Sequence, residues 1–274
     1  MRRLAVAALA AAAIAGTAGT AHAKPQGPAH ASGTAGIYAG TTRHHQFPGP
    51  KVSKPQHLFG GIASDGNGYF IAVPAASSEI RVFRQLDATG AISSPEYEVP
   101  TAGNAPARGP RSWKMHLEAQ HAGRGDYSLH GKFNSVDGYL ALHLRRLPST
   151  RRATPLAERS GPYRGVDVNR GTRARITLDA KGRFHGTDAD GCRLSGALTR
   201  TGQMNLFAAR VTLSGGAACQ GEMQGVAFFA GGDRTGRLPR AKPPFLYLIA
   251  SDGDFSHGMA MELSRRPGTP AGKQ

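Results

Sequence analysis

The sequence predicts an all-β protein built from two small antiparallel β-barrel or sandwich-like domains. Short segments in which apolar and polar residues alternate recur along the chain, and turn-forming residues bound each of them. Gly and Pro are abundant, at 37 and 18 of 274 residues, and they show no three-residue period, which suits the turns of many short strands rather than collagen. After the first 23 residues, no stretch spaces its apolar residues as an amphipathic helix of three turns would.

The first 23 residues have the layout of a secretory signal peptide. Met1-Arg2-Arg3 is basic, residues 4–19 are mostly Ala, Leu, Ile and Val, and Ala21-His22-Ala23 is a small-x-small cleavage pattern. The apolar run is too short and too rich in Ala and Gly for a membrane anchor. We therefore expect cleavage after Ala23 and a soluble, periplasmic or secreted product without a transmembrane segment. Residues 24–35, rich in Pro, Gly and Ala, are expected to be disordered.

The first β-domain is predicted over residues 36–147. Two hairpins are indicated there, because turn-forming residues separate segments 58–62 and 69–73, and again segments 126–133 and 139–147. Alternation also predicts strands at 79–86 and around Trp113.

The second β-domain is predicted over residues 160–265, after a basic, Pro-containing linker at 148–159, and residues 266–274 are expected to form a disordered tail. A hairpin joins 173–178 to 183–186, and further strands are expected at 192–199, 206–213, 222–230, 245–250 and 257–263. Gly36-Ile37-Tyr38-Ala39-Gly40 is similar to Gly161-Pro162-Tyr163-Arg164-Gly165, which lies 125 positions later. This weak repeat leaves open whether the two domains are duplicates.

Cysteine usage is consistent with export. The two cysteines, Cys192 and Cys219, are 27 positions apart, and an even count in an oxidising compartment indicates a disulfide. The loop-entropy model assigns such a bridge about 3.5 kcal/mol of stabilisation. Two reduced, buried thiols are the alternative.

Several motifs in the second half resemble those of a known group of proteins. They are Gly161-x-Tyr163-x-Gly165, Ile176-Thr177-Leu178, Gly182-x-Phe184-x-Gly186-Thr187-Asp188, Gly191-Cys192-x-x-Ser195-Gly196, Asn205-Leu206-Phe207, Val211-Thr212-Leu213, Cys219 and Gly225-Val226-Ala227-Phe228-Phe229. In these residues the chain is similar to a family of exported proteobacterial proteins of unknown function, often lipoproteins, with two small β-domains. The resemblance covers most of residues 160–265. It implies small β-barrel domains and carries no activity, and the chain lacks a lipid-attachment cysteine at the expected cleavage point.

The sequence contains none of the common catalytic motifs. A G-x-S-x-G elbow, an H-E-x-x-H pair and a phosphate-binding glycine loop are all missing. A polysaccharide-acting enzyme needs only two carboxylates that meet in space, for which Asp188 with Asp190 or Glu96 with Glu98 are the candidates. We expect no metal site and no cofactor, and the sequence leans towards a non-enzymatic protein.

The chain is strongly basic, with 34 Lys and Arg against 18 Asp and Glu and a net charge of +16. Loss of Arg2 and Arg3 with the signal peptide would leave +14. The densest basic cluster lies at the junction of the predicted domains and forms the candidate anion-binding site: Arg145, Arg146, Arg151, Arg152, Arg159 and Arg164. Arginine pairs bidentately with phosphate and carboxylate groups. The charge could instead be compositional, since Arg173, Arg175 and Arg183 are spread along predicted strands, where they would simply face water.

These observations predict an exported, soluble, non-enzymatic β-protein that binds an anionic envelope component such as lipopolysaccharide, anionic lipid or acidic polysaccharide, or an acidic protein. Nucleic acid is not expected as a partner, because the chain is exported and lacks aromatics interleaved with basic residues. The alternatives are a polysaccharide-acting enzyme and a periplasmic inhibitor or immunity-type protein. An inhibitor with this charge would need an acidic target.

Overall fold

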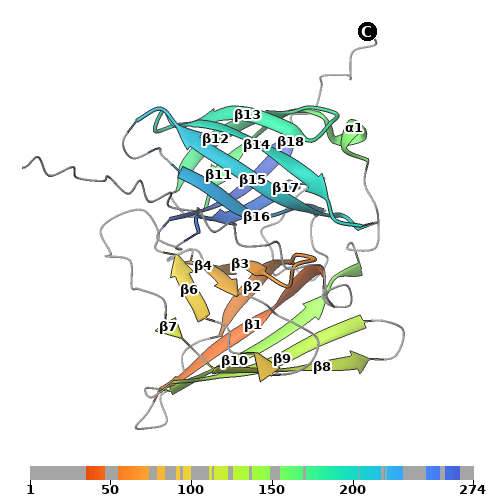
Figure 1. The fold of residues 1–274 in the computed structure, drawn as a ribbon, viewed down its shortest axis with the longest axis vertical. Coiled ribbons are helices and arrows are strands. Elements are labelled where there is room, and N and C mark those ends of the chain that lie inside the picture. Colours follow the sequence, from red (N-terminus) through yellow and green to blue (C-terminus); the bar gives the residue numbers. More distant parts are fainter. Residues whose placement is uncertain are drawn as a thin grey trace, which may run out of the picture.

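In the computed structural model the chain is all-β, with one ten-stranded sheet, one closed eight-stranded barrel and a single turn of helix among the described residues (Figure 1). The structure describes residues 35–46, 55–73, 79–83, 91–92, 95–99, 111–112, 114–122, 126–135, 138–148, 155–168, 171–202, 204–216, 219, 221–230, 245–253 and 257–265. The expected signal peptide and the expected tail at 266–274 lie outside these residues, as does the predicted disordered segment apart from Ala35. Within them no helix has the length and apolar character needed to cross a membrane.

The first half of the chain forms the ten-stranded antiparallel sheet. Its strands run in the spatial order β5-β8-β9-β10-β1-β2-β3-β4-β6-β7. The two-residue strands β5 and β7 are its edges, so within the described residues this half is one open sheet rather than the barrel or sandwich expected from the sequence. The strands are β1 (Gly36–Gln46), β2 (Gln56–Ile62), β3 (Gly68–Val73), β4 (Glu79–Phe83), β5 (Ala91–Ile92), β6 (Pro95–Val99), β7 (Arg111–Ser112), β8 (Lys114–Ala122), β9 (Asp126–Ser135) and β10 (Gly138–Arg146).

The second half forms a closed barrel, one of the two architectures that the sequence predicted. Each strand pairs with the next along the chain, and the barrel closes where the last strand pairs with the first. The strands are β11 (Gly161–Asp167), β12 (Thr172–Leu178), β13 (Arg183–Asp188), β14 (Arg193–Arg200), β15 (Leu206–Ser214), β16 (Gly221–Ala230), β17 (Phe245–Ser251) and β18 (Gly258–Arg265).

The weak sequence repeat marks equivalent places in the two halves. In each half the repeat lies in the strand that comes first along the chain, β1 or β11. This strand pairs with the one that comes last along the chain in the same half, β10 in the sheet and β18 in the barrel. Tyr38 and Tyr163 are both buried. Two residues later, a Cβ at Gly40 or Gly165 would collide with a carbonyl oxygen of the last strand. Glycine is therefore needed at both positions so that the first and last strands can lie this close.

The sheet packs against one side of the barrel exterior, where β2 contacts β16 and β3 contacts β17 (Figure 1). The ring of Phe59 of β2 meets the stacked rings of Phe228 of β16 and Tyr247 of β17 edge to face, with centroid distances of 5.1 and 4.8 Å. Residues 226–230 and 246–251 are buried on both faces, because one face points into the barrel and the other meets the sheet. The contact contains these apolar residues of the two halves: Ile37, Phe59, Ala63, Tyr69, Ile71, Leu206, Val226, Phe228, Ala230, Tyr247, Ile249 and Ala260.

A single turn of helix, α1 (Leu156–Arg159), falls in the segment predicted as a linker and was not expected. Leu156 packs against the barrel core. The Tyr163 hydroxyl donates a hydrogen bond to the backbone carbonyl of Arg159 at 2.7 Å, and Arg265 donates to the carbonyl of Glu158 at 2.9 Å. These contacts hold the turn onto the barrel at the start of β11.

Candidate anion-binding face

The interior of the barrel is filled with apolar side chains. Twenty buried residues from all eight strands form one core, none more than 6% exposed. Large side chains of neighbouring strands contact one another in it, as in the edge-to-face contact of Phe207 of β15 and Phe229 of β16, with centroids 5.8 Å apart. Side chains that fill an eight-stranded barrel leave its exterior as the surface that can hold a partner.

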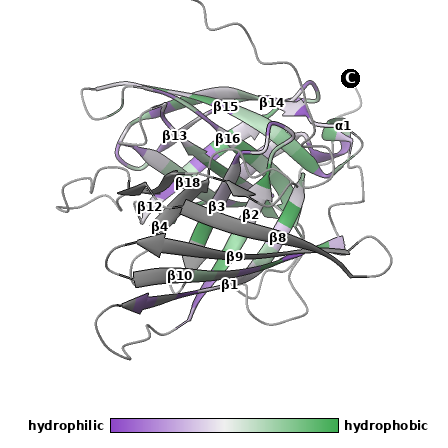
Figure 2. Cartoon of the chain, turned by 60° about the horizontal axis from the view of Figure 1, so that its bottom comes forward, coloured by the Kyte–Doolittle hydropathy of each residue, from purple (hydrophilic) through white to green (hydrophobic). Residues whose placement is uncertain are grey.

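The barrel exterior has two parts of opposite character. The part on β16 to β18 and the start of β15 is largely apolar and is covered by the ten-stranded sheet. The part on β11 to β14 and the rest of β15 faces solvent, because inward apolar residues alternate there with outward polar ones. The apolar positions of the barrel strands are green in Figure 2. A candidate binding surface therefore lies on the solvent-facing part.

Seven exposed arginines lie on the described strands of this surface: Arg164, Arg173, Arg175, Arg183, Arg193, Arg200 and Arg210. Four of them, Arg164, Arg173, Arg175 and Arg193, are grouped by the strand register, and we call these four the arginine face. Arg164 of β11 is the direct cross-strand partner of Arg175 of β12. Arg173 lies two residues before Arg175 and therefore on the same face of β12. Thr187 of β13 is the cross-strand partner of both Arg175 and Arg193. Three of the arginines thus lie in one row across four neighbouring strands.

No member of the arginine face forms an ion pair with a described residue. The ion pairs present in the described part of the barrel are those of Arg183 with Asp179 and of His257 with Asp252. Arg175 donates from Nε to the Thr187 hydroxyl at 3.0 Å, a neutral partner that leaves the guanidinium charge uncompensated. Like charges on directly opposed residues repel, so a bound anion would relieve the repulsion within this face.

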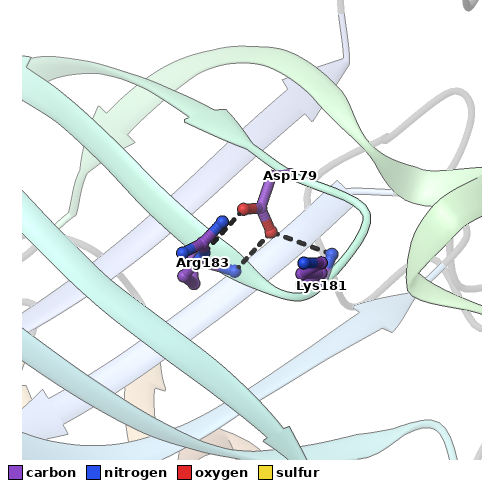
Figure 3. Close-up of polar contacts among 3 residues, drawn as sticks. All are labelled: Asp179, Lys181 and Arg183. Carbon is purple, nitrogen blue, oxygen red and sulfur yellow. Dashed lines mark hydrogen bonds and ion pairs between the residues drawn. The ribbon is translucent and has the colours of Figure 1, made fainter.

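Arg183 shows the contrasting, neutralised arrangement at the β12–β13 turn (Figure 3). One Asp179 oxygen accepts backbone N–H bonds from Lys181 and Arg183 at 2.9 and 2.8 Å, and the other accepts from Arg183 Nε at 2.9 Å. Desolvation acts to raise the pKa of Asp179, but the hydrogen bonds from Arg183 and Lys181 together outweigh it and lower the pKa. Arg183 therefore has a carboxylate partner and is not part of the arginine face.

The arginines predicted at the domain junction have different surroundings. Arg151 and Arg152 lie outside the described residues. Arg145 is exposed on β10 of the sheet, whereas Arg146 is half-buried, with Nη2 3.2 Å from the sulfur of Met204.

The other two predicted arginines lie on the barrel side of the junction. The Arg159 guanidinium lies 5.6 Å from the centroid of the Phe229 ring. Burial raises the pKa of the neighbouring Tyr163 hydroxyl, an effect that the charges of Arg265 and Arg159 oppose. Arg164 alone among the six predicted residues belongs to the arginine face.

The predicted carboxylate pairs gain no support as catalytic groups. Asp188 is buried, and its Oδ1 accepts backbone N–H bonds from Asp190 and Cys192 at 3.0 and 2.8 Å, so it shapes the β13–β14 turn, whereas Asp190 is exposed. The side chains of Glu96 and Glu98 are outside the described set.

Beside the β13–β14 turn, Cys192 and Cys219 form the expected disulfide, with Cα atoms 5.3 Å apart. Across the described residues no group of three His, Cys, Asp or Glu is placed to hold a metal ion.

Sequence reasoning located the exposed arginines but missed their grouping. The alternation over 173–178 predicted that Arg173 and Arg175 face water. Their convergence with Arg164 and Arg193 depends on the register of β11, β12, β13 and β14. The sequence feature that could have indicated this grouping is the position of these arginines at outward-facing sites of neighbouring strands.

The chain matches no family model, and comparison with curated proteins and with solved structures finds no similar protein.

Proposed function

We propose that this protein is an exported, non-enzymatic binding protein that holds an anionic component of the cell envelope on its arginine face. The observation that carries the proposal is the row of Arg164, Arg175 and Arg193 across neighbouring strands, without a carboxylate partner among the described residues. Export is supported by the signal-peptide layout of the first 23 residues and by the disulfide, since such bonds persist in oxidising compartments.

The chemistry of the face favours phosphate, sulfate or carboxylate groups. A guanidinium presents donors in a planar fork that pairs bidentately with such anions, and these charge-assisted hydrogen bonds are stronger than neutral ones. The net charge, +16 for the whole chain and +14 without Arg2 and Arg3, adds a long-range field that speeds the approach of an anion. This field is screened over about 8 Å at physiological salt, so binding should weaken as salt increases.

Binding of the purified chain to three probes tests the proposal: lipopolysaccharide, phosphatidylglycerol vesicles and alginate. We expect binding to at least one probe at low salt and its loss at high salt. The variant Arg164→Gln/Arg175→Gln should weaken this binding. The matched control, Arg43→Gln/Arg145→Gln, removes the same charge from exposed arginines of the ten-stranded sheet and should retain it.

Two results would overturn the proposal: no binding to any of the three probes at low salt, or an equal loss of binding in both variants. The equal loss would show that net charge, rather than the arginine face, is responsible.

Export is tested separately, by N-terminal sequencing of the protein from cells that express the whole chain. A product that begins at Lys24 outside the cytoplasm is expected, and a cytoplasmic product that retains Met1 would contradict it.

A further inference from the structure

We propose that the ligand of the arginine face is a linear acidic polysaccharide that lies across the strands, rather than a lipid bilayer. This inference rests on the proposed function and names the class of anion. It follows from the direction in which the arginines are arranged, the curvature of the surface and the side chains between them.

The arginines are part of a longer row that runs around the barrel. Cross-strand pairing links Arg164 to Arg175, Arg175 to Thr187, and Thr187 to Arg193. The row continues to Ser264 of β18 on one side and to Ser214 of β15 on the other. With strands about 4.8 Å apart, the three steps from Arg164 to Arg193 cover about 14 Å. Such a row offers repeated cationic sites to a ligand with repeated anionic groups.

The surface that carries this row is convex. The barrel is closed by eight strands, and the steps from β11 to β14 cover three of the eight intervals around it. A flat bilayer follows such a convex surface less closely than a polymer that bends around it, so the spread of Arg164 and Arg193 over three intervals favours the polymer. A linear polymer can bend around the barrel and reach both.

Hydroxyl and imidazole groups accompany the arginines. Next to the arginine row, a second outward-facing row pairs Thr177 with His185, His185 with Ser195, and Ser195 with Thr212. These hydroxyl and imidazole groups can exchange hydrogen bonds with sugar hydroxyls, while the guanidinium groups bind the acidic groups. Each repeat of an acidic polysaccharide presents both kinds of partner.

The face lacks the aromatic platforms that single-stranded nucleic acids use. Among the described residues the one exposed large apolar side chain is Val166, at 39% exposed. Since binding of single strands depends on bases stacked on aromatic rings, the arrangement favours a ligand held by charge and hydrogen bonds.

One arginine of the row, Arg175, is already oriented by a neighbouring side chain. The arginines project from paired strands, and Arg175 Nε is held by the Thr187 hydroxyl, which leaves both terminal nitrogens for an anion. A group that is already oriented loses less conformational freedom when it binds.

Titration calorimetry with oligomannuronates of two, four and eight residues tests the inference on the full purified chain at low salt. Affinity should increase with length until the oligomer spans the row. Arg193→Gln should lower the affinity for the eight-residue oligomer about tenfold, a typical effect of one charge-assisted hydrogen bond, and should leave the affinity for the two-residue oligomer nearly unchanged. Arg43→Gln is the matched control and should change neither.

The contrary outcomes separate the inference from the function on which it depends. Equal affinity for all three lengths, no effect of Arg193→Gln, or tighter binding to phosphatidylglycerol vesicles or to a single-stranded oligonucleotide would overturn the polysaccharide assignment while anion binding stands. No binding to any of these probes would overturn both. Unchanged thermal unfolding by circular dichroism shows that each variant is folded.

Discussion

Arg164 and Arg175 are direct cross-strand partners on the barrel exterior, both exposed and neither paired with a described carboxylate. Opposed like charges lower the stability of a sheet by a few tenths of a kcal/mol. Replacement of Arg164 by Gln should therefore raise the free energy of unfolding by about 0.3 kcal/mol at low salt. The difference should vanish at high salt, because screening removes the repulsion. Urea unfolding at the two salt concentrations measures it.

The control is Arg43→Gln, since Arg43 is exposed and has Ala141 as its cross-strand partner in β10. This variant should have nearly the stability of the unmodified chain at both salt concentrations. A loss of stability in Arg164→Gln at low salt would contradict the like-charge description of the pair.

Phe59 should be a main stabilising residue of the contact between the sheet and the barrel, because its ring lies against Phe228 and Tyr247. Truncation of a buried Phe to Ala costs about 3–5 kcal/mol. Phe59→Ala should lower the free energy of unfolding by that amount and should increase binding of a dye specific for apolar surface. Val166→Ala, at an exposed apolar residue of the barrel, should change the free energy of unfolding and the dye binding only slightly.

Asn205 should stabilise the end of the barrel through a pair of buried hydrogen bonds. Its side-chain nitrogen donates to the carbonyl of Phe229, and its side-chain oxygen accepts from the Phe229 N–H at 3.4 Å. Because Asn205→Ala leaves both backbone groups without this partner, it should cost about 2 kcal/mol in chemical unfolding. A change no larger than that of the exposed Thr212→Ala would show that water replaces the side chain.

Glu262 should make stability depend on pH. It is half-buried on β18 opposite Tyr247, and desolvation raises its pKa. The folded pKa lies above the unfolded value of about 4.3, so its contribution is complete below that pH and is lost as the pH rises through the folded pKa. Glu262→Gln should thus be more stable than the unmodified chain at pH 8, with the gain absent near pH 4.

Thermal unfolding across this pH range measures the effect. Glu222→Gln, on the exposed exterior of β16, is the matched control and should follow the profile of the unmodified chain. A Glu262→Gln variant that is less stable at pH 8 would contradict the desolvation argument.

The sequence was sufficient to predict the barrel strands from β12 to β18, since local alternation such as that of Arg173, Ala174, Arg175 and Ile176 reports which side chains face inward, but no strand was predicted at β11. Local patterns do not report which distant strands pair. The pairing of Gly165 with Leu263, which closes the barrel, joins residues nearly a hundred positions apart. The openness of the first sheet was missed for the same reason.

The site could be predicted only in part. The sequence contained Arg164 in a dense basic run and Arg173 and Arg175 on a strand, but their common surface results from strand register. The apolar run at 226–230 indicated a strand, and the outward Phe228 in it is buried because the ten-stranded sheet covers it, a tertiary contact that alternation cannot reveal.

Backbone amide shifts in nuclear magnetic resonance spectra reveal which residues contact an anion, and so whether the arginine face is the binding surface. During titration of the labelled full chain with the eight-residue oligomannuronate, we predict the largest shifts at Arg164, Arg175 and Arg193 and their cross-strand neighbours on β11 to β14. Shifts concentrated instead at Arg145, Arg146 and Arg159, or spread over all exposed basic residues alike, would contradict the arginine face as the binding surface.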